Sequence, residues 1–83
     1  MDIEIRSVSD EVLDFLTSSP TPEAIIAFKA SSATQRRLRE LLDANRNGTM
    51  TPEERSELDE FEQIDYFVSR LKIRARKKFS EDA

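Results

Sequence analysis

Apolar residues in the last third of the chain repeat with the period of an α-helix. They are three or four positions apart and therefore share one face: Leu58, Phe61, Ile64, Val68, Leu71 and Ala75. Tyr66 and Phe67 widen this stripe near its middle. Because no Gly or Pro interrupts the segment, the pattern predicts one helix of about 25 residues, or about 40 Å.

The long helix has a clear start signal, and a shorter helix precedes it. Thr51 to Glu54 form a capping box with proline at the first helical position. A second capping box, between Ser32 and Gln35, starts a helix at residues 33–44 with the apolar stripe Leu38, Leu41 and Leu42. We predict an antiparallel hairpin of these two helices. The shorter one covers less than half of the longer one, so the far half needs another cover.

Two further short helices are predicted in the N-terminal part. Ser9 is a good N-cap for a helix that ends before Pro20, because proline disfavours helical geometry in the residue before it. Thr21 and Pro22 start the next helix, whose apolar residues lie at 24–28. Either these helices or a partner protein covers the far half of the long helix.

These elements predict an all-α fold with a single domain of four helices at residues 9–79. Residues 1–8 alternate weakly between apolar and polar types, and we expect a flexible or docked arm there. Residues 80–83 are expected to form a tail. With 83 residues in total, the chain buries only about 60% of its unfolded surface, so a second copy or a partner is a natural complement to its thin core.

Composition excludes several chemistries. The chain has no Cys and no His, which removes disulfides, thiolate nucleophiles, zinc sites of the usual ligands and His-based catalysis. No apolar run approaches the roughly 20 residues of a membrane span, and the acidic start does not resemble a signal peptide. We expect a soluble, cytoplasmic, non-catalytic protein without a membrane partner.

Charge is strongly polarised along the chain. Residues 70–78 carry six basic residues and no acid, so the remainder carries a net charge of −10 against a total of −4. The basic segment is placed to satisfy the dipole at the C-terminal end of the long helix. Overall acidity and the lack of an aromatic platform beyond Phe79 argue against nucleic-acid binding by this protein alone.

The segment between the two longer helices matches the ligand pattern of an EF-hand calcium loop. Calcium takes about six to eight oxygen ligands, and the loop turns sharply at a glycine, here Gly48. The ligand positions are occupied by Asp43, Asn45, Asn47, the Thr49 carbonyl, Thr51 and Glu54. Only two of these are acidic, no second loop is present, and Arg39 and Arg55 stand where EF-hand helices carry aromatic and apolar residues. A helix-ending Asn-Gly turn followed by a cap explains the same residues without metal.

Several short motifs resemble those of a group of small helical bacterial proteins, common in cyanobacteria. Some of these proteins are encoded beside genes for HNH-type nucleases or other toxin-like products. The similarity covers residues 10–78 and rests on the segments at 11–16, 21–29, 37–42, 45–54 and 57–61. It implies a helical, antitoxin-like accessory protein whose partner is a toxin or nuclease encoded nearby, and it implies that the calcium-ligand set is not a family requirement.

Two functions follow from these observations. The first is a non-catalytic, antitoxin-like protein-interaction module, with a homodimer as a further option. It would use the far half of the long helix, namely Phe67, Val68, Leu71, Arg70, Arg74 and Lys77. The alternative is a single EF-hand-like protein that binds calcium weakly.

Overall fold

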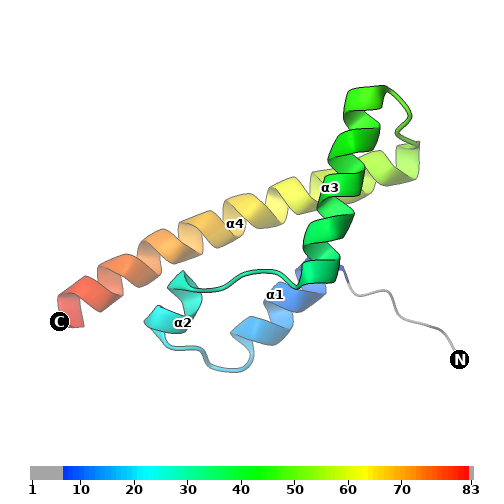
Figure 1. Cartoon of the computed structure of the whole chain (residues 1–83). Coiled ribbons are helices and arrows are strands. Elements are labelled where there is room, and N and C mark those ends of the chain that lie inside the picture. Colours follow the sequence, from blue (N-terminus) through cyan, green and yellow to red (C-terminus); the bar gives the residue numbers. More distant parts are fainter. Residues whose placement is uncertain (1–6, 83) are drawn as a thin grey trace, which may run out of the picture.

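Four helices make up residues 7–82, the part of the chain that the computed structural model describes (Figure 1). They are α1 (Val8–Leu16), α2 (Pro22–Ile26), α3 (Ser32–Asn47) and α4 (Pro52–Asp82). No strand occurs within these residues. The prediction of an all-α, four-helix protein with a long C-terminal helix is confirmed.

Helix α4 has 31 residues and forms the long axis of the molecule (Figure 1). It is longer than predicted because residues 80–82 continue the helix, so they do not belong to a separate tail. Thr51 and Glu54 cap its start as predicted: Thr51 Oγ1 accepts from Glu54 N at 3.1 Å, and Glu54 Oε1 accepts from Thr51 N at 3.0 Å. No helix within residues 7–82 is both long and apolar enough to cross a membrane.

Two predicted N-caps are corrected. Helix α1 is capped by Ser7 rather than Ser9, through a capping box with Asp10 that lets Val8 enter the helix and become buried. Of the arm predicted at residues 1–8, all but Ser7 and Val8 lie outside the described residues. Helix α3 is capped by Ser31 rather than Ser32: Ser31 Oγ accepts from Thr34 N at 3.2 Å.

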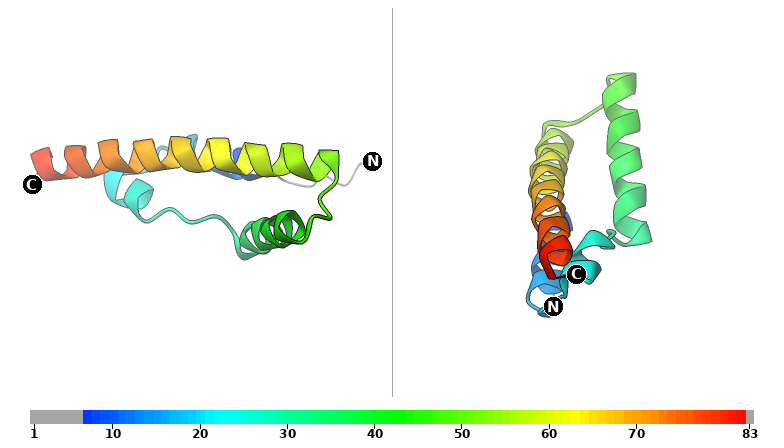
Figure 2. Two further views of the ribbon diagram at one scale, coloured as in Figure 1. Left: turned by 90° about the horizontal axis from the view of Figure 1, so that it is seen from above. Right: turned by 90° about the vertical axis from the view of Figure 1, so that its left-hand side faces the viewer.

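Helix α3 crosses α4 steeply. In Figure 2 the view from above shows α3 almost end-on while α4 lies along its full length. The core therefore sits at the crossing, near the N-terminal end of α4. Leu41 and Leu58 are fully buried there, with Val8 and Phe61 beside them and Leu38, Met50 and Ile64 packed around them. The predicted packing on this part of α4 is present for Leu38 and Leu41, whereas Leu42 is exposed, and Val8 adds a contribution from α1.

The N-terminal helices cover one side of the rest of α4. Helix α2 packs more extensively on α4 than the other helices do. The backbone after it is held in place by a hydrogen bond from Lys72 Nζ to the Phe28 carbonyl at 2.9 Å, and by the rings of Phe15 and Phe28, whose centroids are 4.6 Å apart. Ala75 is buried on α4, and Val68 and Leu71 are half-buried. The intramolecular cover that we considered for the far half of α4 is therefore the one observed.

Helices α1 and α3 are joined by a carboxylate. Glu11 accepts hydrogen bonds from the Ser31 backbone N–H at 2.9 Å, from the Ser31 hydroxyl at 3.0 Å and from the Thr34 hydroxyl. An acidic group at a helix N-terminus is stabilised by the unpaired N–H groups there. This contact fixes the start of α3 against α1 and thereby helps to set the steep crossing.

Candidate functional site

Large apolar side chains are exposed on the side of α4 that faces away from the other helices. Tyr66 is 67% exposed, Ile73 62% and Phe67 46%. Three basic residues, all exposed, lie between and beside them at helical spacing. We call this surface the outer face; it consists of Tyr66, Phe67, Arg70, Ile73, Arg74 and Lys77.

The outer face is a mixed aromatic and cationic surface. The Arg70 guanidinium lies 5.7 Å from the centre of the Tyr66 ring, within the range of a cation–π contact. Single exposed apolar residues are common on protein surfaces, but here three gather on two adjoining turns of one helix. Fully burying a large apolar side chain is worth about 1.5–3 kcal/mol relative to leaving it exposed, so this surface favours contact with another apolar surface.

The residues predicted to bind a partner divide between two faces of α4. Phe67, Arg70, Arg74 and Lys77 belong to the outer face, whereas Val68 and Leu71 are half-buried on the inner side. The apolar periodicity of α4 marks the inner face, because it follows burial within the chain. The apolar periodicity therefore does not predict which residues of α4 are exposed for binding.

Tyr66 and Ile73 were missed as binding residues. We expected Tyr66 to widen the core stripe, and it is instead the most exposed of the large apolar residues on this helix. The usable signal was their separation of seven positions, which is two helical turns, off the main stripe and among basic residues. Apolar residues that break the amphipathic pattern of a helix identify its free face.

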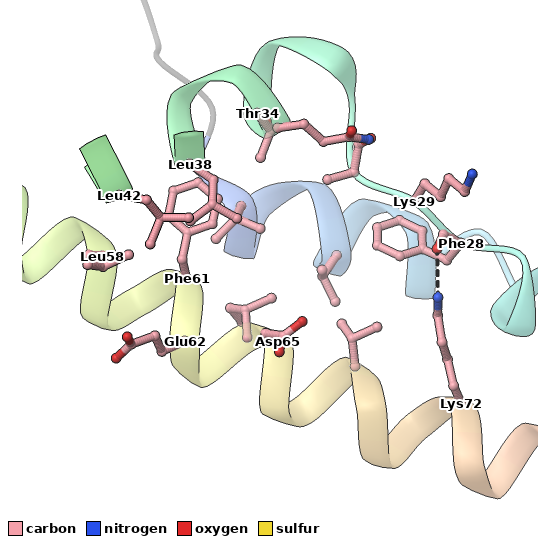
Figure 3. A pocket seen from close by; sticks show the side chains of 16 residues that line it. Phe28, Lys29, Thr34, Leu38, Leu42, Leu58, Phe61, Glu62, Asp65 and Lys72 are labelled. Carbon is pink, nitrogen blue, oxygen red and sulfur yellow. Dashed lines mark hydrogen bonds between the residues drawn. The ribbon is translucent and has the colours of Figure 1, made fainter. Parts of the chain in front are cut away.

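A separate apolar groove lies where α3 diverges from α4 (Figure 3). It has a volume of about 400 Å³, and its walls come from α1, the α2–α3 connection, α3 and α4. Leu42, 43% exposed, lies on one wall, with Glu62 and Asp65 on α4 and Lys29 on the connection. The groove follows from the steep crossing, which leaves the leucines of α3 only partly covered.

The calcium-ligand residues are not brought together. Asp43, Asn45 and Asn47 lie within α3. Residues two positions apart in a helix are separated by a rotation of about 200° about its axis, so Asn45 points to the side opposite Asp43 and Asn47. Asp43 Oδ1 is paired with Arg46 at 3.1 Å, and Asn45 Oδ1 accepts from Arg55 at 2.7 Å. Gly48, the C-cap of α3, has φ +73°.

The second half of that segment serves as a cap for α4. Thr51 and Glu54 bond each other's backbone N–H groups, and Thr49 N donates to the Ala44 carbonyl at 3.0 Å, which closes the end of α3. Within residues 7–82 no three acidic side chains are grouped so as to hold a metal ion. Calcium binding stays a prediction, and it would require the last turn of α3 to unwind.

An ion-pair cluster connects α3 to α4 near the core. Arg37 donates to both oxygens of Glu57, each at 2.9 Å, and to Glu40 at 3.0 Å, while Glu54 lies 3.7 Å away. These hydrogen bonds from Arg37 hold the pKa of Glu57 below its usual range, and the carboxylates of Glu57 and Glu40 raise the pKa of Arg37. Arg37 and Glu57 therefore both stay charged, and their ion pair connects α3 to α4.

Comparison of the chain with protein-family models, with curated proteins and with solved structures gives no match. The candidate site is therefore defined by the geometry of the outer face alone.

Proposed function

We propose that this protein is a non-catalytic, antitoxin-like protein-interaction module that binds a protein partner through the outer face of α4. The observation that carries the proposal is the exposure of Tyr66, Phe67 and Ile73 together on one side of the helix. Interfaces are enriched in aromatic residues and arginine, and both are present here.

The chemistry of the outer face defines the partner. Arg70, Arg74 and Lys77 are exposed and lie within the basic segment at 70–78, so the partner's contact surface is acidic around an apolar centre. A toxin or nuclease encoded nearby, as the sequence resemblance implies, would bind here through such a surface. The partner would then cover the three exposed apolar side chains.

Site-specific photo-crosslinking in cells tests this proposal. A benzoylphenylalanine placed at position 73 should form a covalent adduct with a protein other than this chain, whereas one placed at the exposed Arg46 on α3 should not. The double charge reversal R70E/R74E should reduce the adduct about tenfold, because acidic partner groups would then be repelled. The matched reversal R36E/R39E, on exposed residues of α3, should leave it unchanged.

Absence of an adduct at position 73, or equal adducts at positions 73 and 46, would overturn the proposal. An adduct that R70E/R74E leaves intact would show that the basic residues take no part. All the substituted side chains are exposed, so each variant should fold as the wild type does. Circular dichroism of each variant checks this.

A further inference from the structure

The outer face continues toward the N-terminal end of α4, where its charge changes sign. Asp59 lies on the same side of the helix as Tyr66 and Lys77, and Glu62 lies at its edge; both acids are exposed. Along the helix, the acidic residues Asp59 and Glu62 therefore come before the exposed apolar residues, and the basic residues Arg74 and Lys77 come after them.

These charges have no ion-pair partner within the described residues. The ion pairs of residues 7–82 involve Arg37 and Arg46 with acids of α3 and the first turns of α4, and none includes Asp59, Glu62, Arg74 or Lys77. The outer face thus has two opposite sets of charges free for a contact outside the chain.

We infer that the outer face binds a second copy of this chain, with the two α4 helices antiparallel. The inference rests on the proposed function, because both use the same surface, and it goes beyond it by naming a further occupant of that surface, a copy of the chain itself. A two-fold axis beside residue 68 places residue 66 of one copy level with residue 70 of the other. The same rotation brings Asp59 level with Lys77, and both lie on the line of contact at each end. Glu62 and Arg74 are also level, but they lie on opposite edges of the face and add only to the charge of each end.

The apolar residues then occupy the middle of the contact. Tyr66 and Ile73 of each copy lie between the charged ends, with Phe67 at the flank, and Arg70 of one copy is level with Tyr66 of the other. Arginine over an aromatic ring is a favourable pair, and it already occurs within the chain between these two residues. A symmetric contact needs a self-complementary surface, and the reversal of charge about an apolar centre provides one.

Within the part of the chain that the structure describes, the residues of this surface are exposed over the required length. Residues 59 to 77 extend for about 28 Å along the helix. Figure 2 shows α1, α2 and α3 placed to the sides of α4, with one side of the long helix left open along its length. A single pair of helices forms a small interface, so we expect a reversible dimer with a Kd in the range of about 10–100 µM.

Charge-swapped variants test the antiparallel dimer by analytical ultracentrifugation of the purified chain. The wild type should pass from monomer to dimer between about 1 µM and about 1 mM. D59K/E62K makes the whole face basic and R74E/K77E makes it acidic, so each alone should associate at least tenfold more weakly. An equimolar mixture of the two should form a mixed dimer, because both ends of the contact then attract.

Two controls make the test specific. R36E/R39E changes the net charge as much as R74E/K77E does, on another surface, and should dimerise as the wild type does. The chain has no Cys, so cysteines introduced at positions 59 and 77 in separate copies report the orientation. An antiparallel contact favours the mixed disulfide, and a parallel one favours the two symmetric disulfides.

A wild type that stays monomeric at every concentration, or a mixture of the swapped variants that fails to associate, would overturn the inference. So would preferential formation of the symmetric disulfides. The proposed function fails differently, when the adduct at position 73 in cells contains no protein other than a second copy of this chain. A monomeric protein that still forms an adduct with a different protein would retain the proposed function and exclude the second copy.

Discussion

The two halves of α4 share one helical pattern but differ in what surrounds them. The N-terminal half lies at the crossing of α1 and α3, with Leu58 fully buried and an ion pair from Glu57 to Arg37. The C-terminal half is covered on one side by α2, a helix of five residues none of which is fully buried. Its opposite side exposes aromatic and basic side chains.

This difference separates stability from binding along a single element. A periodic apolar stripe predicts which side of a helix is buried, but the extent of burial depends on the size of the opposing element. The inner side of α4 therefore serves the fold, most strongly in the N-terminal half, and the outer face, whose apolar and basic residues lie at positions 66–77, is available for contact. The following substitutions test that division.

Leu58→Ala should have the largest effect on folding. Its side chain is 2% exposed in the core at the crossing, and removal of such a side chain costs about 2–5 kcal/mol of unfolding free energy. Leu71→Ala, in the half-covered part of α4, should cost less than half as much. Urea denaturation of both variants measures the ratio, and equal losses would refute the division between the halves.

Gly48→Ala should have the next largest effect, since it alters the turn that sets the angle between α3 and α4. The φ of +73° is unfavourable for a residue with a Cβ and costs about 1–2 kcal/mol. Apart from the adjoining stretch of chain, no atom lies within 4 Å of an added Cβ, so the cost comes from the backbone conformation. Gly48→Asn should cost less, because asparagine tolerates this region. Identical melting temperatures for the two variants would contradict this explanation.

Arg37→Gln should have a smaller effect, and one that depends on pH. The folded-state pKa of Glu57 is lowered by Arg37, so the pair's contribution is present above the usual glutamate pKa and lost as the pH falls through the lower folded value. Both side chains are 38% exposed, which limits the contribution to about 0.5–1 kcal/mol at neutral pH.

The measurement for this pair is the unfolding free energy of wild type and Arg37→Gln at about pH 7 and about pH 3. The difference between them should shrink at the lower pH. Arg39→Gln, an exposed residue of the same helix, provides the control and should show no such change. A difference that persists in acid would assign the effect to packing of the Arg37 side chain.

Ile73→Ser should have the smallest effect on folding and a clear effect on association. Because Ile73 is 62% exposed, the unfolding free energy of the dilute monomer should change by less than about 0.5 kcal/mol. The same substitution should weaken the dimer about tenfold, as it removes one of the apolar residues that lie between the charged ends of the contact. A loss of stability comparable to that of Leu58→Ala would place Ile73 in the core instead.

Local chemistry made most of the fold predictable. The capping box of Thr51 and Glu54, the Thr21-Pro22 start and the stop before Pro20 depend on neighbouring residues only, and all three occur as expected. Ser9 and Ser32 were predicted as caps in place of Ser7 and Ser31 because nearby serines offer equivalent caps, and long-range contacts choose between them. Val8 is buried against the core, and Glu11 binds Ser31.

The candidate site was less predictable, because exposure is a tertiary property. The sequence places Phe67 and Val68 side by side, yet one is exposed and the other half-buried once α2 packs against α4. The steep crossing of α3 likewise depends on contacts such as Glu11 with Thr34, 23 positions apart. The calcium-loop pattern ignores that α3 continues through Asn47, which places its first ligands on a helix.

The polarity of charge along α4 also has a kinetic consequence. With acids toward one end, bases toward the other and a long dimension of 48 Å, the molecule has a large electric dipole along its longest axis. Such a dipole orients an approaching charged surface before contact and accelerates productive encounters. The association rate constant should therefore fall as salt is added, whereas the dissociation rate, which depends on the apolar centre, should change little.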